Sequence, residues 1–500
     1  MRACLLPMLF ILAAFSANAA MAQGDSDESR TIEKIKLLGG KIERDDKLPN
    51  RPVVGVSFDI SPGDEVKSSR RFNDKDLPLL KSFKSLTTLS LSTTQVTDAG
   101  LKELAKFDSL ASLDLSETSL SDLSPNHLKG IRNLTKLELS NVRLTDFGAK
   151  NLAKLTNLTE LRLNYNQITD IGLKDLGTLK SLTVLWLDNN RITDAGLKEL
   201  RGLKNLVELR LDDNKITDAG LKDLSSLREL RTLSLIQTQI TGIGLKDLGE
   251  LRNLTTLILW NSPKITDAGM KGVAVLKNLR ELYLQDAGIT DAGLKEVSEL
   301  ENLTKLELQN TRITDAGLKE LSGLMNLTDL DLRNTRITDA GLRELSGLMN
   351  LTRLQLNKTQ VKDAGLKDLT GLTKLDLLNL NETTITDAGL KEVGKITSLT
   401  SLSLHGAQIS DEGLKDLNQL RNLTYLSLGN TPITDAGLKE LNGLTKLATL
   451  MSYCTEVTDA GIQELSGLRN LRSLYVYRTK VTDAGVKKLN ASLPALKIVH

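Results

Sequence analysis

The residue types that most enzymes use for catalysis are few in this sequence and lie far apart. The three histidines are His127, His405 and His500, and none lies near another histidine or a cysteine with the spacing of a metal site. The sequence contains neither a Gly-x-x-x-x-Gly-Lys phosphate-binding loop nor a Gly-x-Ser-x-Gly nucleophile turn. We therefore predict no catalytic residue, no metal site and no cofactor, and expect a protein that is not an enzyme.

Acidic side chains are abundant, but most of them recur at one place in a repeated pattern. Asp194, Asp218 and Asp315 each follow a threonine at the start of an expected short helix. An oxygen at the helix start can accept a hydrogen bond from a free backbone N–H group. Either the threonine or the aspartate, as at Thr314 and Asp315, is therefore expected to cap the helix, and we interpret most of the aspartates in this way. The acidic turns at residues 188–190 and 212–214 leave a weak cation site as an alternative.

Aromatic residues make up only 3% of the sequence, and they are the best candidates for binding. Trp and Tyr are frequent anchors of protein interfaces, and here they fall on the exposed side of expected strands. The alternative explanation is that both residue types simply suit exposed strand positions. One predicted binding cluster consists of Tyr165, Trp186, Ile236, Ile258, Trp260 and Tyr283, and the second of His405, Tyr425, Met451, Tyr453, Tyr475 and Tyr477.

A stretch that recurs every 24 residues must position these side chains. The nine residues 313–321, Ile-Thr-Asp-Ala-Gly-Leu-Lys-Glu-Leu, return with little change from Val96 to Leu489. A fixed period of this length indicates a solenoid. Each unit is expected to contain a short strand, a turn and a short helix with a buried leucine stripe. Glycine is a poor helix former, so the recurrence of Gly317 and its counterparts predicts close approach of the helix to the neighbouring unit.

The pattern Leu-x-x-Leu-x-Leu-x-x-Thr/Asn-x-Ile-Thr-Asp-Ala-Gly-Leu resembles the leucine-rich repeat, in the type found in exported bacterial proteins and in F-box substrate receptors. The resemblance implies an α/β horseshoe solenoid, with a parallel sheet on the concave face and short helices on the convex face. The family's usual Asn or Cys at the ninth position is mostly Thr here, as at Thr311, and its hydroxyl is expected to hydrogen-bond the loop backbone. A repeat fold is a specific indicator of structure but not of function.

The chain start predicts export. Residues 1–22 have the positive start, short apolar run and small residues of a secretory signal peptide, and no later stretch is long and apolar enough to act as a transmembrane anchor. We expect a periplasmic, cell-surface or extracellular protein. The predicted organisation is residues 1–22 as signal peptide, 23–85 as polar leader and N-terminal cap, 86–492 as 17 repeats, and 493–500 as a C-terminal edge strand.

Charge narrows the choice of partner. The sequence has 65 Lys and Arg against 63 Asp and Glu, which gives no reason to expect nucleic acid. The outward strand positions carry mixed charges, which fit a protein partner. We predict a non-catalytic protein that binds its partner through the concave face, with self-association through the C-terminal edge as a further interface. The alternatives are a substrate-recognition subunit of an F-box-type ubiquitin ligase, and a cell-surface adhesin or glycan-binding protein for a surface polysaccharide.

Overall fold

The computed structural model describes residues 28–58 and 72–500. The predicted signal peptide, and residues 23–27 and 59–71 of the predicted polar leader and N-terminal cap, lie outside the described residues. The described residues divide into two compact units, the first with residues 28–58, 72–216 and 223–230, and the second with residues 217–222 and 231–500.

The first unit is a sheet with short helices along one side. Its strands are β1 (Lys41–Arg44), β2 (Val53–Ser57), β3 (Thr88–Ser90), β4 (Ser112–Asp114), β5 (Lys136–Glu138), β6 (Glu160–Arg162), β7 (Val184–Trp186) and β8 (Glu208–Arg210). Its helices are η2 (Leu77–Ser82), α2 (Asp98–Leu104), α3 (Ser124–Leu128), α4 (Asp146–Leu152), α5 (Asp170–Leu176), α6 (Asp194–Leu197) and η3 (Lys198–Gly202). Strand β1 is antiparallel to β2, and from β2 to β8 each strand is parallel to the next.

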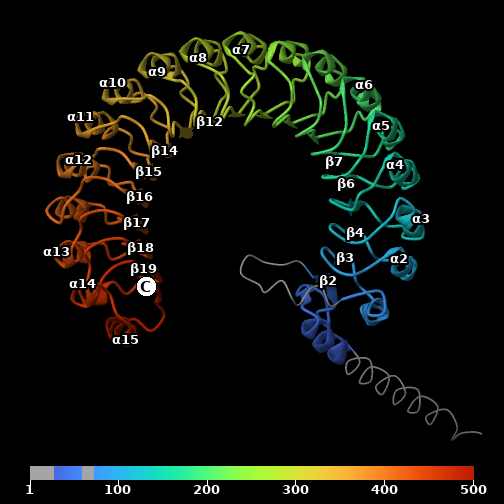
Figure 1. Cartoon of the computed structure of the whole chain (residues 1–500), viewed down its shortest axis with the longest axis horizontal. Coiled ribbons are helices and arrows are strands. Elements are labelled where there is room, and N and C mark those ends of the chain that lie inside the picture. The colour runs from blue at the N-terminus through green and yellow to red at the C-terminus, as the bar shows by residue number, and fades with distance from the viewer. Residues whose placement is uncertain (1–27, 59–71) are drawn as a thin grey trace, which may run out of the picture. The chain divides into compact units, whose positions relative to one another are not determined.

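The second unit repeats the same arrangement without an antiparallel pair. Its strands are β9 (Thr232–Ser234), β10 (Thr256–Ile258), β11 (Glu281–Tyr283), β12 (Lys305–Glu307), β13 (Asp329–Asp331), β14 (Arg353–Gln355), β15 (Leu377–Asn379), β16 (Ser401–Ser403), β17 (Tyr425–Ser427), β18 (Thr449–Met451), β19 (Ser473–Tyr475) and β20 (Lys497–Val499), each parallel to the next. Its helices are η5 (Ile243–Leu248), α7 (Asp267–Val273), α8 (Asp291–Val297), α9 (Asp315–Leu321), α10 (Asp339–Glu344), α11 (Asp363–Leu366), η6 (Lys367–Leu369), α12 (Asp387–Val393), η7 (Gly413–Gln419), α13 (Asp435–Lys439), η8 (Glu440–Gly443), α14 (Asp459–Glu464), η9 (Leu465–Gly467) and α15 (Asp483–Ser492). One further 3-10 helix, η4 (Asp218–Leu224), includes residues of both units. Within this unit the strands lie on the inner side of the curve and the helices on the outer side (Figure 1).

Leucines from the strand and the helix of every repeat form the core between the two layers. In the repeat that contains β12, Leu306 and Leu308 point inward from the strand side, and Leu318 and Leu321 point inward from α9. All four are fully buried, which no single repeat of 24 residues could achieve alone. The predicted α/β solenoid with a parallel sheet and short helices is therefore confirmed.

The aspartates of the repeat act differently from the prediction. Thr314 caps α9, because its Oγ1 accepts a hydrogen bond from the Ala316 N–H group. Asp291, the aspartate of the preceding repeat, accepts hydrogen bonds from the backbone N–H of Thr314 at 2.7 Å and from its hydroxyl at 2.6 Å. Of the two residues expected to cap the helix, the threonine does so, which confirms that alternative. The interpretation of the aspartates as caps is wrong, because the aspartate links its own helix to the next one.

The close approach predicted at the repeated glycine is confirmed. A Cβ atom on Gly317 would overlap Oδ1 of Asp291, the same oxygen that accepts the Thr314 N–H group. Glycine is required there because the aspartate of the previous repeat occupies the space of a side chain. The ninth-position threonine also behaves as expected, since the Thr311 hydroxyl donates to the Leu308 carbonyl at 2.6 Å.

The N-terminal part of the first unit contains a strand that the sequence pattern did not predict. Strand β2 is mostly buried, with Val53 and Val56 in the core. Its outer edge is covered by β1, whose residues are largely exposed.

In the part of the chain that the structure describes, no helix is both long and apolar enough to cross a membrane.

Candidate functional site

The exposed side of each sheet, here called the strand face, brings residues of successive repeats side by side. Because the strands are parallel and in register, residues that are 24 positions apart become cross-strand neighbours, as Arg162, Trp186 and Arg210 do on β6, β7 and β8. Three outward positions per repeat contribute to this face: the first and last residues of the strand, and the second residue after it. Nearly all the predicted binding residues occupy these positions.

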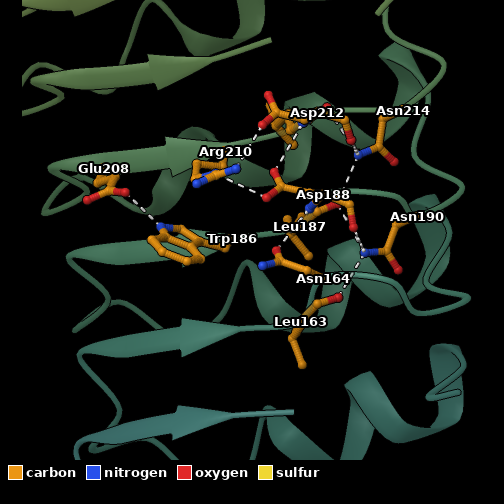
Figure 2. Close-up of polar contacts among 11 residues, drawn as sticks. Leu163, Asn164, Trp186, Leu187, Asp188, Asn190, Glu208, Arg210, Asp212 and Asn214 are labelled. Carbon is orange, nitrogen blue, oxygen red and sulfur yellow. Dashed lines mark hydrogen bonds and ion pairs between the residues drawn. The ribbon is translucent and has the colours of Figure 1, made fainter. Parts of the chain in front are cut away.

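Trp186 is held between two arginines on the strand face of the first unit. The guanidinium carbon of Arg162 lies 4.1 Å from the ring centroid, and that of Arg210 lies 4.7 Å from it. The indole Nε1–H donates to Glu208 at 2.8 Å (Figure 2). Arginines over aromatic rings form attractive cation–π contacts. The indole is therefore bound by its own protein on its faces and at its nitrogen.

The carboxylates next to Trp186 are also engaged. Arg210 forms ion pairs with Asp188 at 3.0 Å and with Asp212 at 3.1 Å, and both carboxylates are buried (Figure 2). Burial raises the pKa of Asp188 to about 7, the Asp212 carboxylate adds to this rise, and Arg210 opposes it. Trp186, Arg162, Arg210, Asp188, Asp212 and Glu208 are called the Trp186 brace below.

The acidic turns of this region are built from internal hydrogen bonds. The Asn190 side chain donates to the carbonyls of Leu163 and Leu187, and its Oδ1 accepts from the Ile168 N–H group. Asn214 makes the corresponding bond to the Leu187 carbonyl one repeat later (Figure 2). Among the described residues, no group of three or more His, Cys, Asp or Glu side chains could hold a metal ion. The turn residues instead connect neighbouring repeats.

The other members of the first predicted cluster differ in their surroundings. Tyr165 belongs to the first unit, as Trp186 does, and is 59% exposed. In the second unit, Ile258 is the cross-strand neighbour of Tyr283, Trp260 is 45% exposed, and Ile236 is half-buried after β9. The Tyr283 ring lies 4.7 Å from the Lys305 ammonium, and its hydroxyl donates to Glu281 at 2.9 Å.

The second predicted cluster contains rings that contact one another. His405, Tyr453 and Tyr477 occupy the same position of their repeats, the second residue after the strand, and Gly429 occupies it between His405 and Tyr453. The rings of Tyr453 and Tyr477 are stacked at 4.6 Å with an angle of 7° between their planes. Tyr453 also reaches across Gly429 to His405, with ring centroids 5.4 Å apart.

Gly429 makes this arrangement possible. A Cβ atom at residue 429 would lie 2.5 Å from Cζ of Tyr453, so any side chain there would push the ring away. The tyrosine therefore uses the space of the missing side chain. This row of residues, His405, Gly429, Tyr453 and Tyr477, is called the tyrosine ladder below.

Three further residues of the second cluster lie beside the tyrosine ladder. Met451 on β18 is the cross-strand neighbour of Tyr475 on β19, and the Tyr425 hydroxyl on β17 lies 3.2 Å from the Met451 sulfur. Burial raises the pKa of the Tyr453 hydroxyl, and the neighbouring Tyr477 adds to the rise, so the phenol is neutral at physiological pH. The structure thus brings together all six residues on one surface formed by β16 to β19 and the turns that follow them.

Comparison with protein families agrees with this geometry. A profile for two copies of the leucine-rich repeat matches residues 132–176, 156–202, 180–227 and 301–346, and a profile for a single repeat matches residues 84–105, 275–298, 395–417 and 419–441. The chain is built of leucine-rich repeats. No curated protein sequence matches it.

Two solved leucine-rich repeat structures illustrate the likeness. An internalin (inlF) from Listeria monocytogenes is 29% identical, the match covers 65% of this chain and 88% of the internalin, and the TM-score is 0.52. A leucine-rich repeat protein from Leptospira interrogans is 26% identical over 86% of this chain and 100% of its own, with a TM-score of 0.53. Leucine-rich repeats are typical of protein-interaction scaffolds, and function resides in the side chains that a given scaffold displays.

Several residues of these sites were missed by reasoning from the sequence. Arg162 and Arg210 are among the mixed charges expected at outward strand positions, but the sequence analysis does not identify them as the groups that enclose Trp186. Gly429 was not singled out at all. The signal that could have found them is the repeat period itself, because residues 24 positions apart in the sequence are neighbours across the sheet.

Proposed function

We propose that this leucine-rich repeat protein is an exported, non-catalytic binding protein that holds a protein partner on the strand face of its second unit. The observation that carries the proposal is the tyrosine ladder, in which stacked rings form an apolar surface beside Tyr425, Met451 and Tyr475. The predicted signal peptide at residues 1–22 supports export.

The chemistry of this surface suits a protein interface. Tyrosine contributes a large contact area together with a hydroxyl that can hydrogen-bond a partner, and methionine adapts its shape to irregular apolar surfaces. The rings of Tyr453 and Tyr477 are already ordered by stacking before a partner arrives. Binding therefore costs less side-chain entropy than it would for isolated tyrosines.

The Trp186 brace is a weaker candidate for the same role. Its ring faces contact Arg162 and Arg210, and its N–H group is hydrogen-bonded to Glu208. A partner would have to displace these groups to reach the indole. We therefore assign partner binding to the tyrosine ladder and a structural role to the Trp186 brace.

Replacing the two stacked tyrosines tests the proposal. Tyr453→Asn with Tyr477→Asn introduces the residue that other repeats carry at this position, Asn357 and Asn381, so the fold should tolerate both changes. We expect the variant to bind its protein partner about 100-fold more weakly than the wild type, because two anchor residues of the interface are removed. The measurement is quantitative mass spectrometry of proteins captured from the native envelope or medium, followed by titration with the purified partner.

A second variant removes no aromatic residue. Gly429→Asn places a side chain in the space that Tyr453 uses, and we expect about a tenfold loss of affinity because the ring is displaced. Gly323→Asn is the matched control, since a Cβ atom there would have no atom within 4 Å. Full partner binding by both the double tyrosine variant and Gly429→Asn would refute the assignment.

A further inference from the structure

Three arginines gather at the edge of the second unit's sheet where the strands begin. Arg231 and Arg280 precede β9 and β11 and lie on either side of Thr255, which precedes β10. The backbone N–H groups of Thr255 and Arg280 donate to the carbonyls of Arg231 and Thr255, respectively, so the three residues form one row across the strands. Arg252, from the loop before β10, joins them around an open hollow of about 550 Å³.

This row departs from the repeat pattern. The residue before the strand is usually a threonine, as at Thr255, Thr304, Thr328 and Thr352, and its hydroxyl donates to the carbonyl of the preceding repeat. Arginine replaces it at residues 231 and 280, which are two repeats apart. Neighbouring parallel strands are about 4.8 Å apart, so the two arginine backbones are separated by roughly 10 Å.

The guanidinium groups of this cluster lack the partners that arginines have elsewhere on the sheet. Within residues 28–58 and 72–500, the side chains of Arg231, Arg252 and Arg280 form neither a hydrogen bond nor an ion pair. By contrast, Arg210 pairs with Asp188, and Arg333 pairs with Asp331. Three uncompensated positive charges at one hollow attract anions.

Amide side chains complete the rim of the hollow. Asn278 donates through Nδ2 to the Arg252 carbonyl at 2.7 Å, and Asn302 donates through Nδ2 to the Lys277 carbonyl at 2.9 Å. These bonds turn the amide nitrogens toward the backbone and leave the carbonyl oxygens as acceptors. The hollow thus combines cations with acceptors for hydroxyl groups.

We propose that this arginine cluster binds an anionic carbohydrate that carries sulfate or phosphate groups. Guanidinium groups match the geometry of such oxyanions and bind them in a bidentate manner. The Asn278 and Asn302 oxygens accept hydrogen bonds from sugar hydroxyl groups, which an inorganic anion does not have. The volume of about 550 Å³ lies within the usual range for small-ligand sites. This site is separate from the tyrosine ladder and does not depend on the protein-binding proposal.

A heparin hexasaccharide serves as the probe, with titration calorimetry of the full chain as the measurement. The test variant combines Arg231→Thr, Arg252→Met and Arg280→Thr, because Thr255 and Met325 show that the repeat accepts these residues at the same positions. The matched control combines Arg421→Met, Arg469→Met and Arg472→Thr, which remove the same three charges from equivalent positions outside the cluster. In the control, the lost guanidinium of Arg472 donates only to backbone carbonyls.

We expect the test variant to bind the hexasaccharide at least tenfold more weakly than the wild type, and the control variant to bind within twofold of it. Circular dichroism melting checks that both variants are folded. Equal losses in the two variants, or no binding by the wild type, would overturn the proposal. The proposal would also be overturned if the wild type bound inorganic sulfate, or the desulfated hexasaccharide, as tightly as the sulfated hexasaccharide. Binding to phosphatidylserine vesicles without binding to the hexasaccharide would assign the arginines to a membrane instead.

Discussion

Trp186 and Tyr453 are displayed by the same kind of strand face, yet their rings have opposite surroundings. Trp186 lies between the guanidinium groups of Arg162 and Arg210, and Glu208 binds its nitrogen. Tyr453 lies between two other rings, His405 and Tyr477. The repeat backbone is the same in both places, so the difference comes from the residues that occupy the neighbouring positions of adjacent repeats.

This contrast shows that an aromatic residue on a leucine-rich repeat does not by itself mark a binding site. Each arginine of the Trp186 brace faces both the indole and a carboxylate: Arg162 pairs with Glu138, and Arg210 pairs with Asp188 and Asp212. In the tyrosine ladder, by contrast, the rings pack against one another. A surface that has already satisfied its polar groups favours the folded chain, whereas an ordered apolar surface favours a partner.

The largest expected effect on stability comes from a feature that both regions share, the glycine at the start of each repeat's helix. Gly196→Val, in the helix of the repeat that contains Trp186, and Gly461→Val, in the helix of the repeat that contains Tyr453, each place a side chain on the aspartate of the preceding repeat, Asp170 or Asp435. We expect each change to lower the free energy of unfolding by about 3 kcal/mol. Chemical denaturation of both variants is the measurement, with Gly323→Val as control because its Cβ would meet no atom within 4 Å. A large loss of stability at only one of the two glycines would show that the contact between the helix glycine and the preceding aspartate does not have the same role in both regions.

Aromatic residues of the Trp186 brace and of the tyrosine ladder are expected to differ in how much they stabilise the folded chain. Trp186→Gln removes two cation–π contacts and one hydrogen bond to a carboxylate, and should cost about 2 kcal/mol. Tyr477→Asn removes one ring from the tyrosine ladder and should cost less than about 1 kcal/mol. Hydrogen exchange measured peptide by peptide compares the two variants. If Tyr477→Asn destabilises its region more than Trp186→Gln does, the assigned roles are reversed.

The smallest expected effect is a pH dependence of the free energy of unfolding that comes from Asp188 in the Trp186 brace. The pKa of Asp188 is raised to about 7 by burial and by Asp212, compared with about 3.9 for an unfolded chain. The folded state therefore binds this proton more tightly, so the contribution to stability is full below about pH 4 and is lost as the pH rises through 7.

Asp188→Asn should remove this dependence, so its loss of stability between pH 6 and 7 should be about 1 kcal/mol smaller than in the wild type. Asn164 shows that the repeat accepts asparagine at this position. Denaturant titration at both pH values is the measurement, and Asp175→Asn on α5 is the control for the loss of one charge. Identical pH profiles for Asp188→Asn and the wild type would contradict the raised pKa.

Most of the fold could be predicted because one period of 24 residues determines it. Leucine spacing identifies the strand and the helix of each repeat, and stacking follows from the need to bury those leucines. Two features could not be predicted in the same way. The role of Asp291 depends on contact with Thr314 in the next repeat, and β1 has an exposed, polar pattern and forms only because the edge of β2 is available.

The candidate site was predictable as a set of positions but not as a set of contacts. Outward-facing tyrosines can be recognised from strand alternation, as Tyr453 and Tyr475 were. Their stacking depends on a side chain that is absent at Gly429, and the enclosure of Trp186 depends on Arg162 and Arg210 lying one repeat away on each side. The role of both clusters in binding remains a prediction.

Site-specific photo-crosslinking tests the central claim most directly. The photoreactive residue p-benzoylphenylalanine replaces either Tyr475, beside the tyrosine ladder, or Trp186, in the brace, and the full chain is irradiated in its native envelope or medium. We predict that the chain substituted at residue 475 forms a covalent adduct with a protein partner, and that the chain substituted at residue 186 forms little or none. An adduct formed mainly from residue 186 would contradict the assignment of partner binding to the second unit.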